Sequence, residues 1–177
     1  MRKTNRVSSL LKAVQASMRK ERWREATELL KKSSVLVEKH WELLWNLGWC
    51  HFKLERFDEA EKYLKKAAEI APRNRNHTCV FGLGVVYLRK KRYKKAVGAL
   101  SEVLQIKDFY PARLSLALAY LEQGKIQEAE NTHLESIRLK PKSCERYEAY
   151  ADFLSDVGRA TEADEMNRKA QELKRVN

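Results

Sequence analysis

The chain has 177 residues, of which 44% are hydrophobic and 34% are charged, and its formal net charge is +12. No stretch approaches the roughly 20 consecutive apolar residues of a membrane-spanning helix, and Met1 to Arg6 leads into an amphipathic segment, not into the apolar core of a signal peptide. Three cysteines, Cys50, Cys79 and Cys144, cannot all pair with one another and lack the spacing of metal ligands. We therefore expect a cytoplasmic protein with unpaired thiols.

An alanine recurs once in each of five units along the chain, and the steps between these alanines are 34, 36, 33 and 34 residues: Ala26, Ala60, Ala96, Ala129 and Ala163. Each of them follows an apolar or small residue by three positions: Trp23, Phe57, Tyr93, Ile126 and Ala160. A fixed period of this length is typical of stacked helical repeats. Because no segment has the pattern of a strand, the sequence predicts an all-α fold.

The pattern around the repeated alanine is clearest in the second unit, which contains Leu47, Gly48, His51, Ala60, Leu64, Ala67 and Pro72. The third unit repeats it with Leu83, Gly84, Tyr87, Ala96 and Leu100. This spacing resembles the tetratricopeptide repeat, in which W-x2-L-G-x2-Y precedes Ala, Phe and Pro. The resemblance covers nearly the whole chain as five units: 7–40, 41–74, 77–109, 110–143 and 144–177. The first unit departs from the pattern at Ala13 and Val14, and the fifth departs at Tyr150 and Ala151.

The resemblance implies ten helices in antiparallel pairs, wound as a right-handed α-solenoid with one continuous core and a single domain over residues 1–177. Small residues are expected where neighbouring helices cross: Gly48, Gly84, Ala117 and Ala151. Gly124 and Gly158 predict turns between paired helices, and prolines mark the unit junctions: Pro72, Pro111 and Pro141. The last helix is expected to place its apolar residues on one face: Ala163, Met166, Ala170 and Leu173.

Constellations typical of catalysis or cofactor binding are absent from the sequence. His51 and His133 occupy columns of packing residues, while His40 and His77 lie at unit junctions. No histidine pair has the spacing of a helical metal site, and no glycine-rich phosphate loop is visible. We therefore expect no enzymatic activity, no cofactor and no bound metal.

The first helix of the second unit carries an aromatic stripe of Trp41, Trp45, Trp49 and Phe52 at helical spacing. Because Leu43, Leu44, Leu47, Gly48 and His51 already supply the packing face, the tryptophans exceed what the core requires. The alternative is that these tryptophans only pack against adjacent repeats and form no binding surface. An intermediate arrangement has Trp41 packed while Trp45 and Trp49 are exposed. We predict that Trp45 and Trp49 are at least partly exposed on the concave side, close to Phe81 and Val85.

In the tetratricopeptide family the first helices line a concave groove, so the resemblance implies a peptide-binding groove of Trp45, Asn46, Trp49, Phe52, Phe81, Val85, Leu88, Leu114 and Leu118, with Leu121 beyond them. Its occupant is expected to be an apolar or amphipathic segment of a protein. Relatives that grip a terminal carboxylate use lysines, asparagines and an arginine here. This chain has Trp45, Asn46, Trp49, Thr78 and Gly82 in those columns, which argues against a carboxylate clamp.

Charge is distributed unevenly, since residues 1–40 carry a net charge of +7 and residues 144–177 carry −2. Cations at the turns predict a basic edge: Arg19, Arg22, Arg56, Arg89, Lys91 and Arg92. This edge either keeps the solenoid in solution or binds nucleic acid, an anionic membrane or an acidic partner. The neighbouring Trp23, Phe57 and Tyr93 lie in a packing column, which argues against base stacking and against nucleic acid as the main ligand.

The sequence thus predicts a non-enzymatic interaction module, either a scaffold or a chaperone-like adaptor, with the apolar groove as its main site. Two alternatives stay open. One is a solenoid that binds nucleic acid or another anionic partner through the basic edge, and the other is a scaffold whose groove receives an end helix of a second copy.

Overall fold

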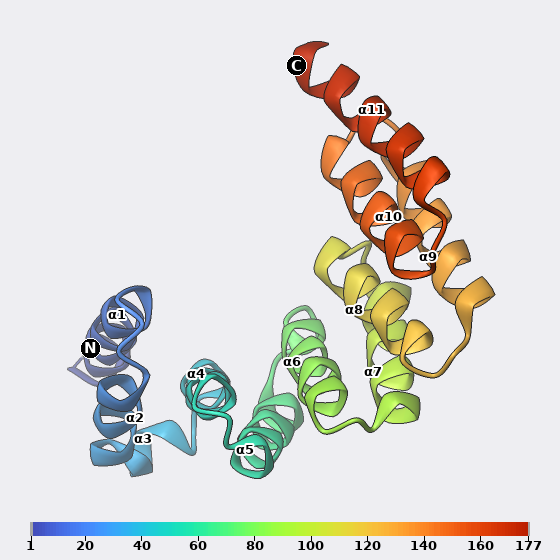
Figure 1. The fold of residues 1–177 in the computed structure, drawn as a ribbon. Coiled ribbons are helices and arrows are strands. Elements are labelled where there is room, and N and C mark those ends of the chain that lie inside the picture. Colours follow the sequence, from blue (N-terminus) through green and yellow to red (C-terminus); the bar gives the residue numbers. More distant parts are fainter. Residues whose placement is uncertain (1, 177) are drawn as a thin grey trace. The chain divides into compact units, whose positions relative to one another are not determined.

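The computed structural model describes the backbone of residues 2–176 and the side chains of residues 6–175. It divides into two compact units, Met1–Arg92 and Tyr93–Asn177, which are larger than the five sequence units, here called repeats. The first unit contains α1 (Arg2–Arg19), α2 (Trp23–Lys32), α3 (Ser34–Val37), α4 (Trp41–Lys53), α5 (Phe57–Ile70) and α6 (Asn76–Arg89). The second contains α7 (Tyr93–Ile106), α8 (Tyr110–Leu121), α9 (Ile126–Leu139), α10 (Cys144–Asp156) and α11 (Ala160–Val176). Within each unit, helices that follow one another pack together, and no strand occurs in residues 2–176 (Figure 1).

The repeated alanines occupy the tightest positions of the helix packing, as the sequence predicts. Ala26, Ala60, Ala96 and Ala129 are fully buried, and Ala163 is only 2% exposed. Gly48 has a comparable role, because a Cβ atom added there would lie 2.7 Å from Cγ of Leu64. The same leucine side chain approaches Gly82 of α6, where an added Cβ would lie 3.1 Å away. Leu64 of α5 therefore fills a space that two glycines keep open.

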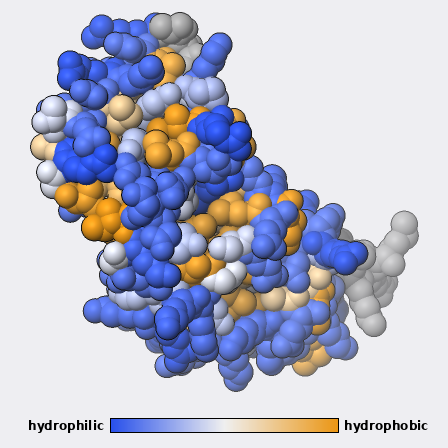
Figure 2. All heavy atoms as spheres, turned by 90° about the vertical axis from the view of Figure 1, so that its right-hand side faces the viewer, coloured by the Kyte–Doolittle hydropathy of each residue, from blue (hydrophilic) through white to orange (hydrophobic). Residues whose placement is uncertain are grey.

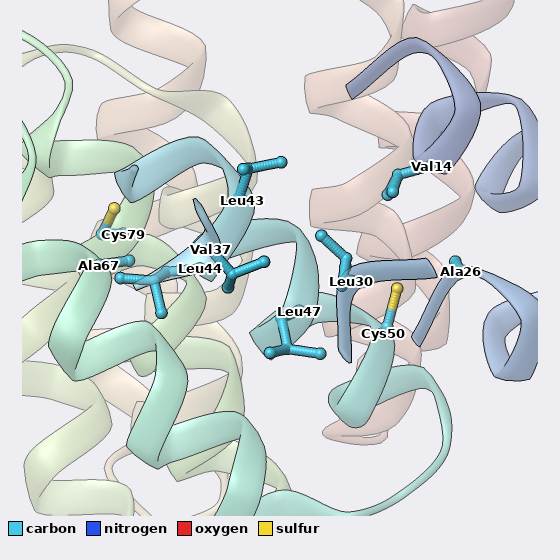
Figure 3. Close-up of a cluster of buried hydrophobic side chains, with 10 residues drawn as sticks. All are labelled: Val14, Ala26, Leu30, Val37, Leu43, Leu44, Leu47, Cys50, Ala67 and Cys79. Carbon is cyan, nitrogen blue, oxygen red and sulfur yellow. The ribbon is translucent and has the colours of Figure 1, made fainter. Parts of the chain in front are cut away.

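Each unit has its own cluster of buried apolar side chains. In the first unit the cluster joins α1, α2, α3, α4, α5 and α6, as Figure 3 shows, through Val14, Ala26, Leu30, Val37, Leu43, Leu44, Leu47, Cys50, Ala67 and Cys79. In the second unit a cluster joins α9, α10 and α11 through Ala129, Tyr150, Ala151, Phe153, Leu154 and Ala163. The apolar face of α11 is directed inward as predicted, since Ala163 and Ala170 are buried and Met166 and Leu173 are half-buried.

The turn after the first helix of every repeat has one backbone design. One residue per turn has a positive φ: Glu21 (54°), Glu55 (58°), Lys91 (54°), Gly124 (70°) and Gly158 (80°). The next amide donates to a carbonyl five residues earlier, as in Arg56 to His51 at 2.9 Å and Arg159 to Leu154 at 2.8 Å. This is the Schellman arrangement, which favours glycine at the left-handed position. The sequence identified this turn only where glycine occupies it.

The structure corrects the predicted number of helices. Residues 2–176 form eleven helices instead of ten, because the second helix of the first repeat ends at Lys32 and resumes as α3. Ser33 and Ser34 lie at this break, and serine competes for backbone hydrogen bonds and so favours helix ends. The equivalent helices α5, α7 and α9 each run for 14 residues without interruption.

The surface is mainly hydrophilic, and apolar side chains gather in several separate patches on the face that Figure 2 presents. Among the described residues, no helix combines the length and the apolar character that crossing a bilayer requires. A single continuous core over residues 1–177 stays a prediction, since each unit is described by itself.

Candidate functional site

The aromatic stripe on α4 is a continuous stack of rings. The rings of Trp45 and Trp49 are 5.7 Å apart and nearly parallel, with an interplanar angle of 5°. Phe52 stacks on Trp49 at 5.0 Å, and Phe57 at the start of α5 continues the row at 5.9 Å in a tilted arrangement. Residues three and four apart on one helix face make this stacking possible, and stacked rings offer a large apolar surface with few rotatable bonds.

The members of the stripe differ in how far they belong to the core. Trp41 and Trp45 pack against the buried cluster of the first unit, and the indole nitrogen of Trp45 donates to the carbonyl oxygen of Thr78 at 3.3 Å. Trp49 and Phe52 are half-buried, stack on each other and do not pack against this buried cluster. The prediction that Trp45 and Trp49 are partly exposed is therefore confirmed, although the surface that Trp45 offers is reduced by its packing against α6.

Asn46 does not share the exposed surface of its neighbours. It is only 4% exposed, and its side-chain amide donates to the carbonyl oxygen of Glu42 at 2.7 Å, one turn earlier on α4. Its helical position, one residue beyond Trp45, turns it toward the packed side. The structure thus corrects the expectation that Asn46 lines an open groove.

The remaining predicted groove residues lie on α6 and α8. Phe81, Val85 and Leu88 on α6 are all half-buried, as is Leu114 on α8. Leu118 on α8 is 47% exposed. Both helices therefore present apolar side chains that their own unit does not fully bury.

Ion pairs occupy half of the predicted basic edge. All six cations are exposed, but Arg22 pairs with Glu25 at 3.5 Å, Arg89 with Glu55 at 3.5 Å, and Arg92 with Glu61 at 3.1 Å. Among residues with described side chains, Arg19, Arg56 and Lys91 make no ion pair. The aromatic column beside the edge is packed as expected: Lys53 lies over Trp23, Arg89 lies over Phe57, and Tyr93 donates to Glu122 at 2.7 Å.

Ion pairs at equivalent turns join one repeat to the next. Arg92 reaches Glu61 of the preceding repeat, and Arg159 reaches Glu130 at 2.7 Å in the same way. Burial alone would raise the pKa of Glu61, but the ammonium groups of Lys65 and Lys90 lower this pKa to about 2. The first repeat has Thr27 at the position of Glu61 and Glu130, so Arg56 of the second repeat has no carboxylate partner there. Part of the basic edge therefore stabilises the stacking of repeats.

The buried histidines and cysteines are packing residues. His51 stacks on Tyr63 at 5.4 Å, and neither of its ring nitrogens has a hydrogen-bond partner. Burial lowers the pKa of His51, and it lowers the pKa of His133 to about 4. Burial also raises the pKa of Cys50 and of Cys79 to about 11, so both stay thiols at neutral pH. Residues with described side chains contain no group of three or more potential metal ligands.

Sequence reasoning missed one buried charge, Arg146 on α10. Its guanidinium donates to the carbonyl oxygen of Ser136 at 2.5 Å, pairs with Asp108 at 3.3 Å and lies over the ring of Tyr110. The signal was available, because the equivalent positions in other repeats are fully buried apolar residues: Leu43, Cys79 and Ala112. A charged residue in such a column requires buried partners.

Paired helices, a glycine or alanine at the crossing position of four repeats and one recurrent turn define this molecule as an α-solenoid of helix-turn-helix repeats. Two models of the tetratricopeptide repeat match residues 42–108 and 110–143, and the chain belongs to this family. Solved structures show the same fold: the MamA crystal structure aligns with a TM-score of 0.72 at 21% identity, covering 92% of this chain and 94% of that one. The repeats of a putative kinesin light chain from Podosopora anserina align with a TM-score of 0.81 at 18% identity, covering 98% and 97%.

Two curated proteins share part of this sequence. The human protein O-mannosyl-transferase TMTC2 is 32% identical over 129 residues, which are 66% of this chain and 15% of that protein. The BBSome complex member BBS4 of Bos taurus is 30% identical over 105 residues, which are 59% of this chain and 20% of that protein. The chain thus spans a fifth or less of these two relatives.

Proposed function

We propose that this tetratricopeptide solenoid is a non-enzymatic scaffold or chaperone-like adaptor that binds an apolar or amphipathic segment of a partner protein. The aromatic stripe on α4 is the main contact surface. Interaction through protein partners is the general role of this fold, and membership of an assembly in the name of the BBS4 relative is consistent with it.

The observation that carries the proposal is the state of Trp49 and Phe52. Both rings stack at 5.0 Å, both are half-buried, and neither belongs to the buried cluster of its unit. Large aromatic side chains left on a surface are the residues that most often anchor a binding partner. The row of rings would receive aliphatic side chains that recur every three or four residues on a bound helix.

Neighbouring helices extend the same chemistry in the proposal. Phe81, Val85 and Leu88 on α6 would contact the segment beyond the stripe, and Leu114 and Leu118 on α8 would contribute a second apolar surface. The basic edge is assigned a solubilising and stacking role, because three of its six cations are already paired. A cytoplasmic location belongs to the proposal as well, supported by three cysteines that are all free.

A peptide selection tests the proposal. A random peptide library is selected on the immobilised chain, and the recovered peptides are labelled and titrated by fluorescence anisotropy. We expect peptides rich in leucine, isoleucine and phenylalanine, whose affinity falls at least about tenfold in Trp49→Ala. Ile106→Ala removes another exposed apolar side chain, 53% exposed on α7, and is the matched control that should bind normally.

Three outcomes would contradict the proposal. Peptides that bind Trp49→Ala as tightly as the native chain would exclude the stripe. Oligomers that dissociate in Trp49→Ala, with no peptide recovered, would favour the self-associating scaffold. Nucleic acid bound tightly at physiological salt, and lost when Arg19, Arg56 and Lys91 are replaced by glutamate, would favour the basic edge.

A further inference from the structure

A second surface of the first unit, separate from the aromatic stripe, is an open groove between α1 and the break that separates α2 from α3. The groove has a volume of about 1440 Å³ and is lined by residues 6–12 and 15 on one side and by 32–36, 39 and 40 on the other. None of the stripe residues lines it. An α-helix is about 10 Å across and rises about 1.5 Å per residue, so this volume corresponds to about 12 residues of a bound helix.

The groove contains an exposed apolar residue that the packing of the fold does not require. Val35 on α3 is 74% exposed, more than any other large hydrophobic side chain among those described. The equivalent positions of the other four repeats are all polar and exposed: Glu69, Gln105, Arg138 and Glu172. Since the fold accepts a polar residue at this position four times, packing does not explain the valine. Val7, Leu10, Leu11 and Leu36 are half-buried around it.

The charged lining has one sign only. Arg6, Lys12, Lys32 and Lys39 line the groove, and no aspartate or glutamate does. None of these four cations makes an ion pair with a described residue, whereas elsewhere in the first unit Lys31, Lys66 and Lys90 are paired with carboxylates. Unpaired cations around an apolar floor complement a ligand that is apolar on one face and anionic on the other.

From these observations we propose that the α1–α3 groove binds an acidic amphipathic helix of a partner protein, at a site that is independent of the aromatic stripe. A second copy of this chain fits less well, because its end helix α11 carries as many basic as acidic residues, exposes polar side chains on its described outer face and directs its apolar residues inward. A membrane surface also fits less well, since the site is a concave groove between two helices and a bilayer presents no ridge to fill it.

The test uses a labelled amphipathic peptide of about 14 residues with leucines at i, i+3, i+4 and i+7 and glutamates between them. We expect its affinity to fall at least about tenfold in Val35→Asp and in the double variant Lys12→Glu/Lys32→Glu. Lys142→Glu/Lys169→Glu makes the same change of charge at exposed sites of the second unit and should leave the affinity within about twofold. Trp49→Ala should also bind this peptide normally, which separates failure at this groove from failure at the stripe.

Four results would overturn the proposal. A peptide with lysines in place of the glutamates could bind equally well, or the Lys142→Glu/Lys169→Glu control could lose as much affinity, which would reduce the effect to general attraction by a +12 chain. Vesicles of phosphatidylserine and phosphatidylcholine could bind more tightly than the peptide and lose this binding in Val35→Asp, which would identify a membrane surface. Sedimentation could reveal a dimer that Val35→Asp dissociates, which would identify a second copy as the occupant.

Discussion

Helices α4 and α10 are first helices of their repeats, and they pack alike while presenting opposite chemistry. On the packing face, Leu47 and Gly48 of α4 correspond to Tyr150 and Ala151 of α10, and all four are buried. On the other face, α4 has Trp45, Trp49 and Phe52 where α10 has Glu148, Asp152 and Ser155. The rings of α4 stack on one another, whereas Glu148 pairs with Lys174 of α11 and the other two side chains are exposed.

This difference separates two kinds of position in the repeat. The packing positions are constrained in size by a neighbouring helix, so their substitution costs folding free energy. The outward positions accept either aromatic or acidic side chains on the same backbone. Residues at outward positions can therefore differ between repeats without a change of fold.

The largest effect is expected from pH, through a histidine on the packing side of α10. His133 of α9 lies 5.1 Å from Phe153 and 5.9 Å from Tyr150, and burial lowers its pKa from 6.5 to about 4. Between these two pKa values the histidine is protonated in the unfolded chain but neutral in the folded chain. The folded state therefore has its full stability above the unfolded pKa of 6.5 and loses stability as the pH falls toward the folded pKa of about 4. We expect a loss of about 2 kcal/mol between pH 7 and pH 5, approaching about 3 kcal/mol near pH 4.

Urea unfolding at a series of pH values measures this loss, and the range above pH 5 keeps it apart from the carboxylates, which titrate lower. His133→Phe keeps an aromatic ring in the site and should remove most of the slope. The lowered pKa of His51 on the packing face of α4 acts in the same direction and accounts for a smaller residual slope. An unchanged slope in His133→Phe would contradict the assignment.

A smaller effect is expected at the crossing of α4 and α5. Gly48→Ala gives α4 the residue that α10 has at this position, yet the new Cβ would lie 2.7 Å from Cγ of Leu64. We expect a loss of about 1 to 3 kcal/mol by overpacking, measured by urea unfolding. Gly98 on α7 has open space around it, so Gly98→Ala should instead stabilise by about 0.5 to 1 kcal/mol through helix propensity. Equal responses at the two glycines would refute the crossing.

The smallest effect is expected in the turns, where the repeats differ in a single residue type. Glu21 and Lys91 adopt the positive φ that Gly124 and Gly158 adopt in later repeats. Replacing either by glycine should stabilise by up to about 1 kcal/mol, and Gly158→Ala should destabilise by a similar amount. Thermal or urea unfolding of the three variants measures these changes in the free energy of unfolding. Similar magnitudes would show that the positive φ costs the same in each of these turns.

Much of the fold could be predicted from the sequence because helix crossings restrict size, and size is visible in a single chain. The alanine column and Gly48 were recognisable for this reason. The break at Ser33 was not recognisable, because serine also occurs inside continuous helices. The shared turn was recognised at Gly124 and Gly158 but not at Glu55, because a non-glycine residue gives no sign of a positive φ.

The aromatic stripe and the partial exposure of Trp45 and Trp49 were predictable from the sequence, whereas the burial of Asn46 and the contact of Trp45 with α6 were not predicted. The stripe of Trp45, Trp49 and Phe52 follows from helical spacing alone. Asn46 follows Trp45 by one residue, and this helical position turns it toward the packed side. The packing of Trp45 against α6 involves a hydrogen bond from its indole nitrogen to the carbonyl oxygen of Thr78 in the next repeat. Such contacts join residues of different repeats, and periodicity within one repeat does not contain them.

The most direct test of the central claim transfers the outward chemistry of α10 to α4 in the variant Trp49→Asp/Phe52→Ser, leaving the packed Trp45 in place. Its free energy of unfolding and its affinity for the peptide recovered by selection are measured together. We expect the free energy of unfolding to fall by less than about 2 kcal/mol and the affinity to fall at least about tenfold. A variant that fails to fold, or that folds and keeps its affinity, would contradict the claim that these two rings form a binding surface and not a part of the core.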